Sequence, residues 1–176
     1  MQTEIVLPQT KPETEWVNGR ALQKTSGTYR HSQLQYFFLT ELEKWVTGRG
    51  RVAPSWRFRV APPGDVVRPL VPDLAFLSFE RVDKQAIEAA QTPLGAPSVA
   101  VEILAPDDIA SDIDDKITVY LKAGADAVAI VDPVTETIWV ESKSGTAHFA
   151  SGDTFEHESL PEFHLDVSRY FIRAKK

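Results

Sequence analysis

An acid inside an apolar run is the strongest constraint that this sequence places on its fold. The segment 98–104 reads SVAVEIL, and Glu102 stands between a valine and an isoleucine. The β-branched residues favour a strand over a buried helix. An ionised carboxylate on a core strand is costly unless it is paired or bound to a metal. Glu102 is therefore a candidate site residue, unless it lies at a strand end and faces solvent.

A second acid has a similar setting. Asp73 opens the short apolar segment 73–79 (DLAFLSF) directly after a proline. Two carboxylates on neighbouring strands repel each other, which raises the pKa of at least one of them. A divalent cation between them removes the penalty, and oxygen ligands suit Mg²⁺ or Mn²⁺. The alternative is that both acids face solvent, as most acids on strands do.

The pattern around these two segments predicts one α/β domain. Apolar residues at spacings of three and four predict a helix that ends before Gly48, with a stripe of Leu34, Phe37, Phe38, Leu42 and Trp45. A second helix is expected from Asp107 or Asp108 to Ala123. Further strands are expected over 51–60, 127–131, 137–140 and 146–150, and the apolar end of the tail 160–171 is expected to pack back onto the body. Residues 1–25, with scattered prolines, are interpreted as an N-terminal arm or short edge strand, and residues 26–176 as the single domain.

Composition excludes several classes of function. The 19 Lys and Arg residues against 25 Asp and Glu residues give a net charge of −6, which does not fit a polybasic nucleic-acid coat. The absence of cysteine excludes disulfides, thiolate metal sites and a cysteine nucleophile. Nucleotide-binding loops and a serine-hydrolase elbow are also absent. With no secretory signal and no apolar run of membrane-spanning length, we expect a cytoplasmic protein without membrane contact.

The second predicted helix carries a candidate catalytic lysine. Asp112, Lys116 and Tyr120 follow one another at four-residue spacing, which keeps them on one side of a helix. Lys116 borders the expected buried stripe, so its side chain can reach the end of the sheet. A cation there can orient a water or stabilise charge that develops on a phosphate. The alternative is a surface ion pair between Asp112 and Lys116, worth a few tenths of a kcal/mol, and spacing alone does not choose.

Charge is distributed unevenly along the chain. Residues 44–68 contain six basic residues against one acid, whereas residues 102–115 contain six acids and no base. An acidic block beside a basic strand fits a metal site with a neighbouring phosphate track, in which the candidate nucleic-acid contacts are Arg51, Arg57 and Arg59. The same pattern equally fits chance and a solvated helix N-terminus, which acids favour.

Several motifs in fixed order resemble one protein family. They are Pro72-Asp73, PSVAVEIL at 97–104, DIDDKITVYLKAG at 112–124 and AIVDP at 129–133. Together with His31-Ser32 and the tail LPEFHLDVSRYF, they resemble the Uma2 family, formerly the domain of unknown function DUF820, within the PD-(D/E)XK nuclease superfamily. The resemblance covers roughly residues 26–172.

This resemblance implies a restriction-endonuclease-like α/β/α core, with a central mixed sheet flanked by helices and extra C-terminal strands. It implies that Asp73 and Glu102 bind the divalent metal, with the backbone carbonyl of Ile103 as a third ligand. The superfamily's usual lysine would stand at position 104, which is Leu104 here. By the resemblance, Lys116 on the helix replaces it.

The resemblance also implies supporting roles and a reaction. Asp112 and Tyr120 fall on matching helix positions and His31 on the first long helix, so all three are expected to support the site. The expected activity is Mg²⁺- or Mn²⁺-dependent hydrolysis of DNA phosphodiester bonds, by a homodimer if both strands are cut. Two alternatives stay open. One is a catalytically inactive nuclease-fold module that binds nucleic acid or regulates, and the other is a structural α/β protein with solvated acids.

Overall fold

A six-stranded mixed sheet forms the centre of the computed structural model, which describes residues 2–25 and 27–175. Its strand order is β10-β9-β8-β7-β6-β3. The neighbours β7 and β8 are parallel, and the other pairs are antiparallel. The strands are β3 (Gly50–Pro54), β6 (Leu74–Ser78), β7 (Val99–Ile103), β8 (Ala127–Asp132), β9 (Thr137–Ser142) and β10 (Gly145–Phe149).

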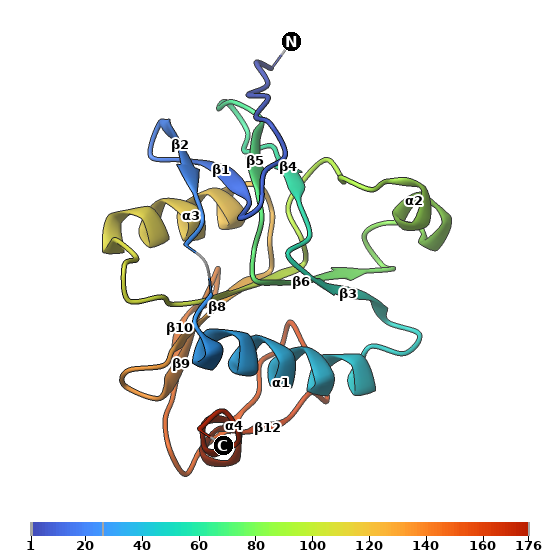
Figure 1. Cartoon of the computed structure of the whole chain (residues 1–176). Coiled ribbons are helices and arrows are strands. Elements are labelled where there is room, and N and C mark those ends of the chain that lie inside the picture. Colours follow the sequence, from blue (N-terminus) through green and yellow to red (C-terminus); the bar gives the residue numbers. More distant parts are fainter. Residues whose placement is uncertain (1, 26, 176) are drawn as a thin grey trace.

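Helices cover both faces of this sheet, which confirms the predicted α/β/α core (Figure 1). Helix α3 (Ala110–Lys122) lies on one face and is the crossover that joins the parallel strands β7 and β8. Helix α1 (Tyr29–Trp45) lies on the other face, with α4 (Val167–Arg173) packed beside it. Both long helices were predicted, α1 from the spacing of its apolar residues and α3 as a helix from Asp107 or Asp108 to Ala123.

The alternation of β7 decides which face receives the acid. Val99, Val101 and Ile103 belong to the hydrophobic core that includes α1. Ala100 belongs to the second core, which includes Tyr120 of α3. Because side chains alternate along a strand, Glu102 projects to the same face as Ala100 and toward α3.

The expected strand over 51–60 is wrong as a single element. It is divided into β3 and β4 (Phe58–Val60), and β4 pairs with β5 (Arg68–Leu70) in a separate two-stranded sheet. Ser55 interrupts the extended backbone, with a left-handed φ of 48° directly after Pro54. Its amide donates to the carbonyl of Asp73 at 3.1 Å, so the chain leaves the central sheet beside the first predicted acid.

A β-hairpin near the N-terminus was not predicted from the sequence. Strands β1 (Thr14–Val17) and β2 (Arg20–Gln23) join through Asn18 and Gly19, whose φ values of 48° and 72° are those of a type I′ turn. The hairpin contacts β5 and α3. Ser26, at the predicted start of the domain, lies outside the described residues.

The remaining elements are short. Residues 81–91, expected to be a surface connection with some helix, contain α2 (Lys84–Ala89). Strand β11 (Thr154–Phe155) pairs with β12 (Leu165–Asp166). The tail continues into α4 and packs back onto the body through Tyr170 and Phe171, as expected. Within residues 2–25 and 27–175, no helix has the length and apolar character needed to cross a membrane.

Candidate active site

The two predicted acids face each other at one end of the sheet. Leu74 of β6 pairs with Val101 of β7 in antiparallel register, so the next position along each strand places Asp73 opposite Glu102. Asp73 is 4% exposed and Glu102 is 3% exposed. The alternative of two solvated acids at strand ends is therefore wrong.

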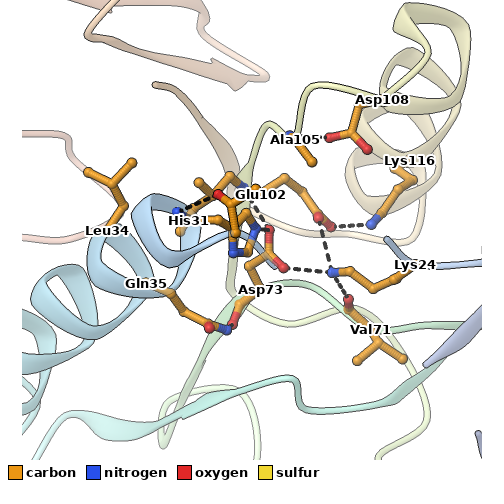
Figure 2. A network of polar contacts seen from close by, with 12 residues as sticks. Lys24, His31, Leu34, Gln35, Val71, Asp73, Glu102, Ala105, Asp108 and Lys116 are labelled. Atoms are coloured by element: carbon orange, nitrogen blue, oxygen red, sulfur yellow. Dashed lines mark hydrogen bonds and ion pairs between the residues drawn. The ribbon is translucent and has the colours of Figure 1, made fainter. Parts of the chain in front are cut away.

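A lysine ammonium lies between these carboxylates (Figure 2). Lys24, directly after β2, places Nζ 2.7 Å from Asp73 Oδ1 and 3.7 Å from Glu102 Oε2. The same Nζ donates to the carbonyl of Val71 at 2.9 Å. One cation is thus shared by both acids, which reduces the repulsion that two buried carboxylates would otherwise have.

The predicted helical lysine reaches the same cluster. Lys116 Nζ lies 2.7 Å from Glu102 Oε1 and 3.0 Å from Glu15 Oε2, and the residue is 4% exposed. Glu15 comes from β1, and its other oxygen accepts the Val71 amide at 2.6 Å. The alternative of a surface pair between Lys116 and Asp112 is wrong, since Lys116 points into the site.

Helix α1 supplies groups on the other side of Asp73. The helix begins at Tyr29 with Thr28 as its cap, and this places His31 in the first turn. His31 Nε2 lies 3.4 Å from Asp73 Oδ2, and the side-chain amide of Gln35 donates to the backbone carbonyl of Asp73 at 2.8 Å. The Ile103 amide donates to Asp73 Oδ2 at 2.7 Å. The Asp73 carboxylate is therefore held on both oxygens.

The surroundings shift the pKa values of the two acids in opposite directions. Burial alone would raise the pKa of Asp73, but the charges of Lys24, His31 and Lys116 outweigh it and hold that pKa well below its usual range. Burial raises the pKa of Glu102 to about 7, against the opposing effect of Lys116 and Lys24. Burial would lower the pKa of His31, yet its hydrogen bond to Asp73 raises it. Asp73 is thus the fixed anion of the site.

The two supporting residues predicted on α3 have different roles. The Tyr120 hydroxyl donates to Glu102 Oε1 at 3.4 Å, and burial raises the pKa of this phenol well above its usual value, so it stays protonated. Asp112 makes no contact with the acid pair. It accepts two bonds from Arg20, at 3.1 and 2.6 Å, and one from Asn18 at 2.7 Å. Asp112 therefore anchors the hairpin to α3.

A small, strongly acidic cavity of about 110 Å³ opens at the cluster. Beside Lys24, Lys116 and His31, its acidic lining residues are Glu15, Asp73, Glu102, Asp107, Asp108 and Asp112. The excess of carboxylates attracts cations and repels a free phosphate. Among the described residues, no three Asp, Glu, His or Cys side chains are grouped as a metal site. Any metal here would keep several waters, as Mg²⁺ commonly does.

The structure does not bring the three predicted nucleic-acid contacts to this cavity. Arg51, on β3, pairs with Glu88 at 2.8 Å. Arg57 donates to the carbonyl of Thr14 at 3.2 Å, and Arg59 makes two bonds to Glu4 at 2.6 and 2.8 Å. Each guanidinium is already bound to a protein acceptor, so contact with nucleic acid stays a prediction for all three.

Sequence reasoning missed Glu15, Lys24 and Gln35. The signal for the first two was Asn18-Gly19, which is the strongest short-range mark of a hairpin. A hairpin over 14–23 would have turned Glu15 and Val17 to one face. Nothing in the sequence indicated that this face would lie against α3.

Comparison with known protein families identifies the family of this chain. The model of the family Uma2, described as "Putative restriction endonuclease", matches residues 3–168. The chain belongs to the Uma2 family. The match begins before the hairpin, so the Uma2 domain includes the segment that carries Glu15 and Lys24.

A solved structure has the same fold. It is a protein from Anabaena variabilis titled as a putative nuclease belonging to DUF820, with a TM-score of 0.84 and 24% sequence identity. The alignment covers 96% of this chain and 94% of that one. No curated protein matches this sequence. The predicted nuclease fold is thereby confirmed.

Proposed function

We propose that this Uma2 protein is a Mg²⁺- or Mn²⁺-dependent endonuclease that hydrolyses phosphodiester bonds of DNA. In this proposal Asp73 and Glu102 hold the metal, the Ile103 carbonyl is a third ligand, and Lys116 assists. The observation that carries it is the shared cation between Asp73 and Glu102. Two buried carboxylates that already accept one ammonium between them suit a divalent cation in the same place.

The donor set supports a hard cation. Carboxylate oxygens predominate among the side chains at this point, beside the imidazole of His31, and the cavity volume of about 110 Å³ leaves room for waters at roughly 30 Å³ each. A bound Mg²⁺ or Mn²⁺ would supply an activated water and neutralise charge on the scissile phosphate. Asp73 suits a permanent ligand because its own pKa is depressed.

Lys116 is placed to act on the phosphate or on the attacking water. An ammonium has three N–H donors. Two of those of Lys116 point to Glu102 and Glu15, which leaves one for an oxygen in the cavity. Lys24, in contrast, already has three oxygens around it. This difference supports Lys116 as the catalytic lysine, in the role that Leu104 cannot fill.

Cleavage of supercoiled plasmid with Mg²⁺ and then Mn²⁺ tests the proposal. Wild type should nick the plasmid, whereas Glu102→Gln and Lys116→Met should reduce the rate by at least about 100-fold, as expected when a group that stabilises the transition state is removed. Asp114→Asn is the matched control, because this exposed acid of α3 does not line the cavity. Equal cleavage by all four proteins would indicate a contaminant and contradict the proposal.

A second candidate is a nucleic-acid-binding module without turnover. This function is favoured because the negative charges of Asp73 and Glu102 are already paired with the ammonium groups of Lys24 and Lys116. A mobility-shift experiment separates the two functions. Retarded DNA that stays intact in Mn²⁺ would support the module, and retardation followed by nicking would support the enzyme. A separate light-scattering measurement of the molar mass of the protein in solution tests the expected homodimer.

A further inference from the structure

We propose that Lys24 is an internal substitute for the metal, which occupies the position between Asp73 and Glu102 in the metal-free protein and is displaced when a divalent cation binds. This inference rests on the proposed metal site. It goes beyond that site because it gives Lys24 an opposing role, as the group that a metal must remove. It also explains how this cluster stays folded without metal.

The geometry around Lys24 Nζ is that of a bound cation. Three oxygens from two segments surround it. Residues 71–73 supply Asp73 Oδ1 at 2.7 Å and the Val71 carbonyl at 2.9 Å, and β7 supplies Glu102 Oε2 at 3.7 Å. Figure 2 shows the ammonium between the two carboxylates. A metal held by Asp73 and Glu102 would compete with Lys24 for these carboxylates, so the ammonium and the metal would not both occupy this position.

Lys24 is also the lysine that can leave. Its side chain is 18% exposed and lines the cavity, whereas the side chain of Lys116 is 5% exposed. Lys24 follows the last residue of β2 and belongs to no helix or strand. Lys116 lies within α3 and is held by Glu15 as well as Glu102. A flexible four-carbon stem lets the Lys24 ammonium move toward solvent without a change in the backbone.

The charges of the cluster favour such an exchange. The cavity is lined by six carboxylates, against the ammonium groups of Lys24 and Lys116 and the imidazole of His31. A divalent cation would reduce this excess of negative charge, and Lys24 would then be available to pair with an incoming phosphodiester anion. The displaced ammonium then lies at the mouth of the cavity, where it can attract a phosphate.

Competition of this kind has a measurable consequence. A ligand binds more weakly when the binding-competent state is only partly populated. Removing the charge of Lys24 should therefore strengthen metal binding. It should also lower the thermal stability of the metal-free protein, because Asp73 loses its closest cation. The two effects are opposite in sign, which a general loss of structure would not produce.

Calorimetric titration with MnCl₂ tests this directly on the full chain. Lys24→Gln should bind Mn²⁺ about tenfold more tightly than wild type, a coupling within the usual range between linked sites. Lys122→Gln is the matched control, because it removes one positive charge from the exposed surface of α3, and it should bind as wild type does. In thermal unfolding without metal, Lys24→Gln should melt below wild type, and saturating Mn²⁺ should close that gap.

A labelling experiment on the wild type needs no variant. An amine-reactive ester, read by peptide mass spectrometry, should modify Lys24 faster when Mn²⁺ is bound, while Lys116 stays protected. The inference is overturned if metal binds but leaves Lys24 labelling unchanged, or if Lys24→Gln binds metal no more tightly than wild type. Absence of Mn²⁺ binding in wild type and Lys24→Gln alike would instead overturn the proposed metal site, and the inference with it. Loss of binding in Glu102→Gln locates the metal.

Discussion

The carboxylate of Glu15 holds the ammonium of Lys116 at 3.0 Å, across a separation of 101 residues in the sequence. The other oxygen of Glu15 accepts the amide of Val71, so the acid cannot rotate away. Lys116 is thereby directed toward Glu102 and the cavity. Glu15 touches neither the proposed metal position nor a reacting atom, and its role is to position Lys116.

Glu15→Gln should lower the rate of plasmid cleavage by roughly 10- to 100-fold, the usual range for losing a partner that orients a site residue. The amide can still accept a hydrogen bond from Val71, but it no longer balances the charge of Lys116. The rate should fall at saturating DNA, and the affinity for DNA should change little. A matched control is Glu13→Gln, directly before β1, where the acid pairs with the surface residue Lys11.

The pairing of Arg20 with Asp112 should make stability depend on pH. Hydrogen bonds from the Arg20 guanidinium hold the pKa of Asp112 below its usual range. A group whose folded pKa is depressed stabilises the protein above its unfolded pKa, and this contribution is lost as the pH falls through the folded pKa. The anchor between the hairpin and α3 should therefore weaken in acid.

Asp112→Asn tests this sign. It should lower the free energy of unfolding by about 1 kcal/mol at pH 7, a modest value because Arg20 is half exposed. The difference from wild type should shrink below about pH 4, where an unfolded aspartate is protonated. Urea unfolding at pH 7 and at pH 3 gives both values. A difference that stays constant across this range would contradict the ion-pair account.

Tyr120 is expected to matter much less than Lys116. Its hydroxyl lies 3.4 Å from Glu102 Oε1, while Lys116 lies 2.7 Å from the same oxygen, so the ammonium is the stronger donor. Tyr120→Phe should cost at most about 1 kcal/mol of stability, and cleavage should stay within about fivefold of wild type. Denaturant unfolding and plasmid cleavage measure the two effects. A loss as large as that of Lys116→Met would show that the hydroxyl acts in the reaction.

The sequence predicted the parts of this site that lie on regular elements. Asp73 and Glu102 stood out because acids are rare within apolar strands, and Lys116 because helical spacing placed it beside a buried stripe. These signals are local, so they can be read from a single chain. The central sheet and its two long helices were predicted for the same reason.

The parts that could not be predicted depend on contacts between distant segments. Lys24 has no periodic neighbours that mark it as buried, and its position follows from the docking of a hairpin on α3. The extended chain is interrupted between β3 and β4, where Ser55 has a left-handed conformation. The ion pairs that engage Arg51 and Arg59 likewise involve partners from distant segments, which the sequence pattern did not indicate.

The packing of α1 against the C-terminal tail gives a final prediction about the fold. Phe38 is fully buried, and its ring lies 5.9 Å from Phe155, 6.0 Å from Phe163 and 5.7 Å from Tyr170 between centroids. Phe38→Ala removes the centre of this aromatic cluster and should cost about 3–5 kcal/mol. Tyr36, on the same helix, is 59% exposed, and Tyr36→Ala should change stability by no more than about 0.5 kcal/mol. Equal melting temperatures for the two variants would show that the tail does not pack on α1 in this way.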